Sequence, residues 1–241
     1  PGSNWPTAPL LDGAVALLGG FAAVERRAAH PVLPLATLRH RSITTGMITN
    51  VLVATVMMST LVVGPYALHN GLELSLPLVG LVMSVGPVTS AVSGILAGRL
   101  VDRTTPAVMI TAGLALVTLG AACLALLPLW WGVVGYIVAL IVLTPGYQLF
   151  LAANNTHVLS DTDPAHRGRI AGALGLSRNL GLITGASAMG VLYAAIDAGM
   201  DAASTGSLSA MRATFLVAAL LAAIATAVSL VPFANRRTLT R

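Results

Sequence analysis

The sequence predicts an all-α integral membrane protein, and three observations carry that prediction. Hydrophobic residues make up 56% of the 241-residue chain, and only 9% of the residues are charged. The mean hydropathy is +0.86, whereas a soluble domain carries about 25% charged residues. The apolar residues also form long segments with little polar surface, as helices in lipid require. A bilayer is therefore the expected solvent.

Seven apolar segments are candidates for membrane-spanning helices, because crossing about 30 Å of hydrocarbon takes roughly 20 residues. The first segment is short, and the other six are long enough to span. Thr105 before Pro106, and Asp163 before Pro164, each place a capping oxygen ahead of a proline at the first helical position. The expected spans lie near 10–24, 43–66, 76–98, 106–128, 130–153, 164–195 and 210–232.

The distribution of arginine predicts the orientation in the membrane. All the arginines except Arg178 and Arg212 fall in the alternate loops 25–42, 99–105, 154–169 and 233–241. The positive-inside rule places these loops in the cytoplasm. Aromatic residues suited to a headgroup belt gather on the other side: Trp5, Tyr66, Trp130, Trp131 and Tyr193. We expect a multi-pass protein of the inner cell membrane, with the chain's N-terminus outside and its C-terminus cytoplasmic.

Charge and residue chemistry limit the partners and disfavour an enzyme. The formal net charge of +5 comes from arginines in separate loops without interleaved aromatic residues, which favours membrane lipid over nucleic acid. The histidines lie in loops and Cys123 is alone, so we expect no metal site and no cofactor. We also expect no enzyme activity, because no span combines residues that could act as a catalytic site.

Three segments carry a resemblance to a known family. The loop Gly98-Arg99-Leu100-Val101-Asp102-Arg103 resembles the GxxxDR signature of the major facilitator superfamily. The segment 166–185, with its RGRIAG and RNLG motifs, resembles the RGxAxG and RxLGxxxG run of drug and proton antiporters. The segment 5–42 is similar to the last extra helix and following loop of the fourteen-helix branch of that family.

This resemblance implies a domain organisation and a function. Residues 1–42 would form an extracytoplasmic tail, the last extra central helix and a cytoplasmic linker. Residues 43–241 would form a six-helix C-terminal bundle of two inverted three-helix repeats. The chain would be the C-terminal portion of a secondary active transporter that exports drugs or other amphipathic small molecules against proton entry. A missing N-terminal six-helix half would be its partner and would hold the proton-coupling carboxylates.

Two other classes of function are weighed against the transporter. One is a non-transporting seven-helix membrane scaffold, or a truncated remnant, that associates through glycine-rich helix faces. The other is a membrane enzyme, which the residue chemistry disfavours. A native start near residue 1 would favour the remnant, whereas six or seven further spans upstream in the gene would favour the transporter.

Arg178 is the main candidate for a residue that contacts substrate or lines a cavity. It lies about 13 Å beyond Arg169 along a helix, close to the middle of the hydrocarbon. A centred arginine costs roughly 2.5 to 3.5 kcal/mol on insertion scales, so its side chain should face the protein interior or a boundary between the two halves. Its expected partners are backbone carbonyls, Asn179, Gln148, cavity water, or a carboxylate of the missing half.

Further polar residues could line a cavity beside two expected helix kinks. Pro87 and the Thr144-Pro145-Gly146 run interrupt the helical hydrogen-bond ladder, and most such kinks do nothing specific. The polar side chains deep enough to line a cavity there are Asn50, Tyr147 and Gln148.

Two stripes of small residues at i, i+4 spacing should let helices approach closely. They serve either ordinary packing within the domain or, as the resemblance implies, contact with the other half. Their members are Gly86, Ser90, Gly94 and Gly98 in the third span, and Ala173, Ser177, Gly181 and Gly185 in the sixth.

The loop after the third span is expected to act as a conformational gate. Its residues are Gly98, Asp102 and Arg103, and the last two would stabilise one state by loop ion pairs and by capping helix ends. The alternative is that the loop is only a positive-inside anchor.

The orientation can be tested by cysteine labelling in a Cys123→Ser background. A cysteine at Asn70 should react with an impermeant thiol reagent added outside intact cells, whereas one at Asp161 should not, because its loop is expected in the cytoplasm. Both should react in permeabilised cells. Reversed accessibility would contradict the orientation.

Overall fold

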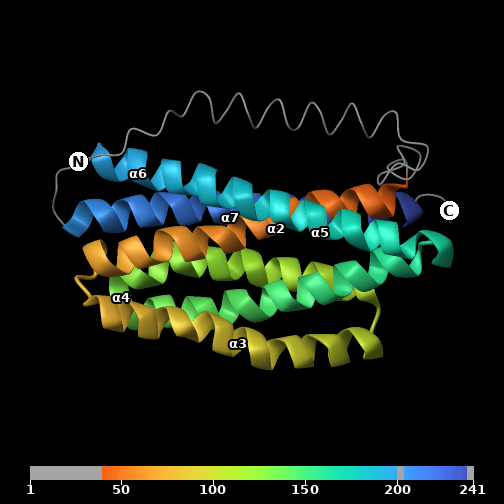
Figure 1. Ribbon diagram of the computed structural model, residues 1–241, viewed down its shortest axis with the longest axis horizontal. Helices are drawn as coiled ribbons and strands as arrows, with labels where there is room; N and C mark the ends of the chain where they lie inside the picture. The colour runs from red at the N-terminus through yellow and green to blue at the C-terminus, as the bar shows by residue number, and fades with distance from the viewer. Residues whose placement is uncertain (1–39, 200–203, 238–241) are drawn as a thin grey trace. The chain divides into compact units, whose positions relative to one another are not determined.

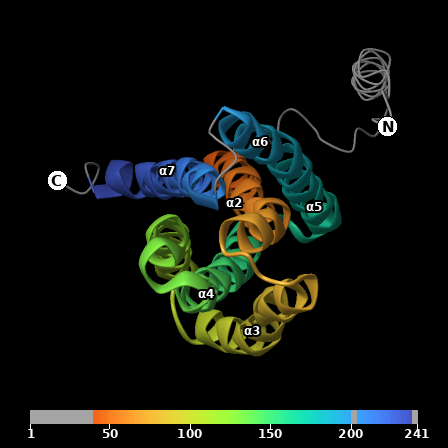
Figure 2. The same ribbon diagram turned by 90° about the vertical axis from the view of Figure 1, so that its left-hand side faces the viewer.

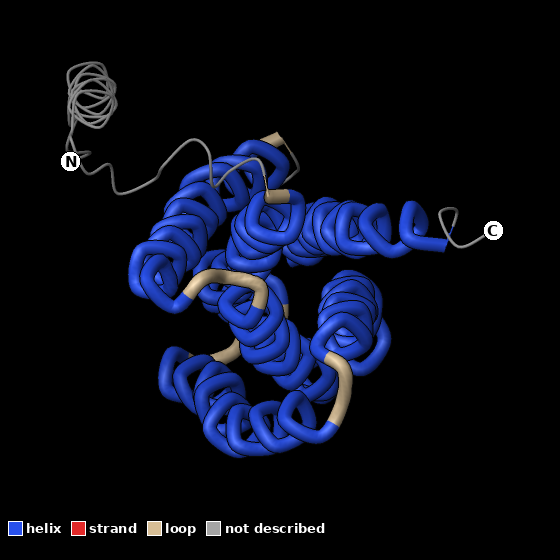
Figure 3. The backbone as a smooth tube through the Cα atoms, turned by 90° about the vertical axis from the view of Figure 1, so that its right-hand side faces the viewer, coloured by secondary structure: helices blue, strands red, loops and turns tan. Residues whose placement is uncertain are grey.

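The computed structural model describes residues 40–199 and 204–237. The chain divides into two compact units, Pro1–His40 and Arg41–Arg241. The expected first span, near 10–24, lies outside the described residues. Helices joined by short loops form the described part of the second unit (Figure 1; Figure 3). The order is α2 (Arg41–Tyr66), η2 (Ala67–Gly71), α3 (Leu76–Arg103), α4 (Pro106–Ser160), η3 (Pro164–His166), α5 (Arg167–Thr184), η4 (Gly185–Met189), α6 (Gly190–Ala198) and α7 (Ser204–Arg237).

Five helical segments in the described ranges are long and apolar enough to cross a membrane. They coincide with the spans expected after residue 42, except that the spans near 106–128 and 130–153 are joined in α4. An all-α multi-pass membrane protein is thus consistent with the structure. The pairing of helices into two inverted repeats stays a prediction, as does the division of the chain into 1–42 and 43–241.

Helix α4 is a hairpin, because the chain reverses at Gly132, where φ is 53° and ψ is −129°. Gly113 lies against the backbone of Phe150, and Gly120 lies against Leu143, so the halves 106–131 and 133–160 run antiparallel. A Cβ atom at Gly120 would lie 2.4 Å from the Leu143 Cβ, a contact that only glycine avoids. Close approach of backbones through small residues is a common basis of helix packing in lipid.

Helix α2 lies at the centre of this unit and contacts α5, α7 and α4 (Figure 2). The α4 hairpin packs against α3 and α7. The largest fully buried side chains include Tyr136, Phe150 and Phe215, which contribute to one apolar core. Many large apolar side chains instead face outward, including Trp130, which is 83% exposed, as expected of a surface covered by lipid.

The two expected helix starts differ in how they are capped. The Asp163 Oδ1 atom accepts a hydrogen bond of 3.0 Å from the Ala165 amide, which confirms the capping role predicted for it. The predicted start of α4 at Pro106, with Thr105 at the N-cap position, is confirmed. The Thr105 hydroxyl makes no capping bond, so the capping part of the prediction is wrong. The Val108 amide, which a capping hydroxyl could have satisfied, donates to the Thr105 carbonyl oxygen at 3.0 Å instead.

Replacing Gly132 with alanine should lower stability by about 1 to 3 kcal/mol, because a positive φ is strained for a residue with a Cβ atom. Gly80 is a matched control, since a Cβ atom at either position meets nothing within 4 Å. Thermal unfolding of the intact protein in detergent should show a lower Tm for Gly132→Ala and an unchanged or slightly higher Tm for Gly80→Ala. Equal melting of the two variants would contradict the strained turn.

Candidate functional site

Two cavities lie along the faces of α2, the second half of α4, and α5. The first, which we call the polar cavity, has a volume of about 190 Å³ and is lined in part by Asn50, Asn155 and Arg178. The second, which we call the apolar cavity, has a volume of about 240 Å³ and also borders α3. Its lining includes Met57, Thr60, Leu61, Met83, Tyr147 and Leu182.

Asn50 projects from α2, is 1% exposed, and holds α2 against α5. Its Nδ2 atom donates to the Leu174 carbonyl oxygen at 2.8 Å and to the Ser177 Oγ atom at 3.0 Å. Only the amide nitrogen can donate to a carbonyl, so these bonds fix which side of the amide carries oxygen. The Oδ1 atom is buried and has no hydrogen-bond partner within the described residues. Asn50 therefore has an unused acceptor and borders the polar cavity.

Arg178 interacts with Tyr147, which was not among the partners expected for it. The guanidinium and the Tyr147 hydroxyl are close enough for charge and hydrogen-bond interactions. Asn179, one expected partner, is exposed, and Gln148, another, bonds elsewhere. The Nε atom of Arg178 is buried and finds no hydrogen-bond partner in the described part of the chain. A buried N–H of this kind is costly unless something accepts from it.

Gln148 joins α4 to α3. Its Nε2 atom donates to the Ser90 Oγ atom at 2.7 Å and to the Ser90 carbonyl oxygen at 3.2 Å. The residue lines neither the polar nor the apolar cavity, although Ser90 borders the apolar one. A Cβ atom at Gly94 would lie 3.2 Å from the same amide nitrogen, so small residues on α3 make room for this side chain.

The small-residue stripe of the sixth span packs against α2 inside the same unit. A Cβ atom at Gly181 would lie 2.4 Å from the Val51 carbonyl oxygen, and one at Gly185 would lie 2.6 Å from the Thr55 carbonyl oxygen. The Thr55 hydroxyl adds a hydrogen bond of 3.0 Å to the Gly181 carbonyl. This face is therefore occupied by α2, which is the ordinary packing alternative and not a boundary with another half.

The stripe of the third span is different. Cβ atoms added at Gly86 or Gly98 would meet nothing within 4 Å, so these glycines have no close neighbour in the described residues. Gly86 and Ser90 border the apolar cavity.

Of the expected gate residues, Asp102 and Arg103 lie exposed at the end of α3, whereas Gly98 is half-buried. Within the described ranges, Asp102 and Arg103 make no ion pair with each other or with another residue. The end of α3 is closed by Thr104, whose hydroxyl donates to the Leu100 carbonyl oxygen at 2.6 Å. Among the described residues, neither Asp102 nor Arg103 makes a capping hydrogen bond here, and their stabilisation of one conformational state stays a prediction.

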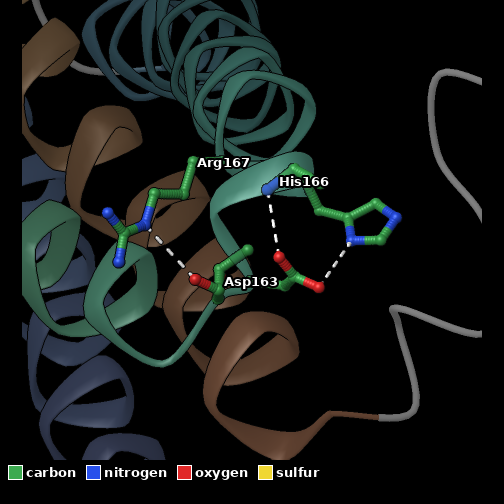
Figure 4. A network of polar contacts seen from close by, with 5 residues as sticks. Asp163, His166 and Arg167 are labelled. Atoms are coloured by element: carbon green, nitrogen blue, oxygen red, sulfur yellow. Dashed lines mark hydrogen bonds and ion pairs between the residues drawn. The ribbon is translucent and has the colours of Figure 1, made fainter.

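A polar network lies at the start of α5, the helix that carries Arg178 (Figure 4). Besides capping the Ala165 amide, Asp163 accepts a 2.8 Å bond at its carbonyl oxygen from the His166 amide. The His166 Nδ1 atom lies 3.9 Å from the Asp163 Oδ2 atom. The Nε atom of Arg167 donates to the Thr162 carbonyl oxygen at 3.3 Å. These contacts fix the turn between α4 and α5.

Two asparagines of α4 complete the site, and sequence reasoning gave neither a role. Asn154 is 2% exposed, and its Nδ2 atom donates to the Gly46 carbonyl oxygen at 3.2 Å, which joins α4 to α2. Asn155 lines the polar cavity. The signal that could have found them is a pair of adjacent amides at the end of an otherwise apolar helix, where unpaired polar groups are costly.

Comparison with known proteins decides the family. The family model described as Major Facilitator Superfamily matches residues 2–186. The chain belongs to the major facilitator superfamily. It is also similar to a protein of Escherichia coli (strain K12) named "Uncharacterized transporter YebQ", with 28% identity over 162 residues. That match covers 67% of this chain and 35% of the relative, so the chain spans about a third of the length of the curated relative.

Family membership confirms the superfamily that the GRLVDR loop and the later motifs predicted. The match extends through the loop after α3, both α4 halves and Arg178. It does not distinguish branches within the superfamily.

Asp102→Asn and Arg103→Lys test whether the exposed end of α3 is a gate or an anchor. In the intact protein, both should insert normally and lose most transport. Asp102→Asn removes the negative charge, and Arg103→Lys keeps the positive charge but loses the planar fork of N–H groups, while Thr104 still closes the helix in both. Transport into proteoliposomes and membrane insertion are measured for each variant. Wild-type transport by both variants would contradict the gate and support the positive-inside anchor.

Proposed function

We propose that this chain is the C-terminal portion of a secondary active transporter that exports drugs or other amphipathic small molecules in exchange for protons. The observation that supports this most is the pair of cavities between α2, α4 and α5, one polar and one apolar. A compound with a polar head and an apolar body needs both environments. The chain's superfamily and the word "transporter" in its relative's name agree with this proposal.

Each candidate residue has a role in this proposal. Asn50, Tyr147 and Arg178 contact the substrate, because all three line the cavities. Gln148 positions α4 against α3 through Ser90. Proton coupling belongs to an N-terminal six-helix half, since the apolar stretches of the described helices contain no carboxylate. The RGRIAG and RNLG motifs support the fourteen-helix antiporter branch.

A membrane scaffold is less well supported. That function relied on glycine-rich faces that are free to associate with another chain. The face of Gly181 and Gly185 is filled by α2, so of the two stripes in the described helices only the α3 stripe of Gly86 and Gly98 is left. Gly86 borders a cavity, which a scaffold does not need.

The proposal is tested with the intact protein in proteoliposomes and an imposed pH gradient. Amphipathic fluorescent compounds should move against their gradient only while the proton gradient persists, and collapse of that gradient should stop the movement. Movement at the same rate with and without the proton gradient would contradict proton coupling. No movement of any compound, by a protein that remains folded, would contradict a transporter.

Filling the apolar cavity should block transport without unfolding the protein. Gly86→Trp places an indole in that cavity and should abolish most transport. Gly80→Trp is the matched control, because Gly80 lies on the same helix, has equal open space, and borders neither cavity. Helix content and Tm are measured beside transport. Equal transport by the two variants would show that the apolar cavity is not on the substrate's path.

A further inference from the structure

Two buried polar atoms without partners belong to residues that line the same cavity. The Nε–H of Arg178 is a free donor, and the Oδ1 atom of Asn50 is a free acceptor. Both residues line the polar cavity, and they come from different helices, α5 and α2. Native proteins satisfy most buried polar groups, so an unused donor and acceptor around one space indicate a ligand that supplies the complement.

The polar and apolar cavities lie next to one another along shared helix faces. On α5, Leu174 and Arg178 line the polar cavity, and Leu182 lines the apolar one at the same i, i+4 spacing. On α4, Leu151 and Tyr147 line the two cavities in the same way. The contact between Arg178, which lines the polar cavity, and Tyr147, which lines the apolar cavity, therefore lies between the two cavities.

The charge at this junction is positive and is not neutralised by the described residues. Arg178 makes no ion pair in the described part of the chain, and the Tyr147 hydroxyl is neutral. A guanidinium binds carboxylate oxygens especially well, because its N–H groups form a planar fork. The head group that this site selects is thus an oxyanion and not an amine.

The acceptor of Asn50 adds a second requirement. Its Nδ2 atom is committed to α5, so the amide cannot turn to donate into the cavity. An ionised carboxylate alone cannot donate a hydrogen bond to the Asn50 Oδ1 atom, since a carboxylate only accepts hydrogen bonds. The ligand must also carry a hydroxyl or an N–H close to its carboxylate.

We propose that the two cavities form one bipartite site for amphipathic carboxylates that carry a hydroxyl or N–H group beside the carboxylate. The carboxylate binds Arg178, the neighbouring donor binds the Asn50 Oδ1 atom, and the apolar body occupies the space beside Met57 and Met83. Asn50 and Met57 are about 10 Å apart along α2, which suits a body the size of a fused aromatic ring. This inference rests on the proposed transport function and names its substrate class.

Binding of three probes to the intact protein in nanodiscs tests the site, with empty nanodiscs subtracted. The probes share one aromatic body: naphthylglycolate has a carboxylate and a hydroxyl, naphthylacetate lacks the hydroxyl, and naphthylethylamine is a cation. Isothermal titration should rank their affinities in that order. Arg178→Gln should lower the affinity for naphthylglycolate by about tenfold or more and abolish the preference for acids over the amine.

Arg212→Gln is the matched control, because Arg212 is exposed on α7 and lines neither cavity. It should bind all three probes as the wild type does. Tighter binding of the amine than of either acid would overturn the inference, as would equal affinity for the two acids. An Arg178→Gln variant with a lower Tm but unchanged selectivity would also overturn it, because Arg178 would then act only in packing.

Transport in proteoliposomes separates this inference from the function on which it rests. Proton-driven movement of naphthylethylamine that Arg178→Gln leaves unchanged would overturn the bipartite site and leave the transporter standing. Binding of naphthylglycolate without movement of any probe would contradict the transporter and support the site.

Discussion

The close contact between α2 and α5 positions most of the polar groups of the proposed site. It is made possible by Gly181 and Gly185, where any Cβ atom would collide with the backbone of α2. Hydrogen bonds from Asn50 and Thr55 to α5 then fix how far one helix is rotated and shifted against the other. Because hydrocarbon offers no hydrogen-bonding solvent, these polar contacts and the small residues beneath them favour one arrangement. Arg178 is held on the cavity side of α5 as a result.

The same constraint explains the α4 hairpin. Its halves touch at Gly113, Gly120 and Gly146, so the two backbones lie closer than side chains would allow. The second half carries Tyr147 toward Arg178, while Gln148, one residue later, points to α3 and binds Ser90. Adjacent residues on one helix thus serve different purposes, one at the cavities and one in holding the bundle together.

Hydropathy predicted the helices well because each span must present a long apolar surface to lipid, whatever its neighbours are. The contacts between helices were harder to predict from the sequence. Asn50 binds groups 124 and 127 residues away, and the partner of Arg178 turned out to be Tyr147, which no spacing rule connects to it. Which residues meet depends on the rotation of each helix, and several rotations are compatible with one hydropathy pattern. The close glycine contacts of α4 were missed for the same reason, since the stripes at i, i+4 spacing lie elsewhere.

The unpaired charge of Arg178 links this packing to the proposed site. An arginine at the middle of a span costs roughly 2.5 to 3.5 kcal/mol, and Tyr147 offers only a neutral oxygen in return. An anion that binds beside Arg178 therefore has a more favourable binding free energy than it would have at a neutral site. A ligand shifts a conformational equilibrium only by as much as its affinities for the two states differ. When the cavity is open to water, solvation weakens the attraction between the anion and Arg178. When the cavity is closed, the low dielectric strengthens that attraction. In the proposed transporter, this poorly compensated arginine would make closure of the bundle depend on the presence of substrate.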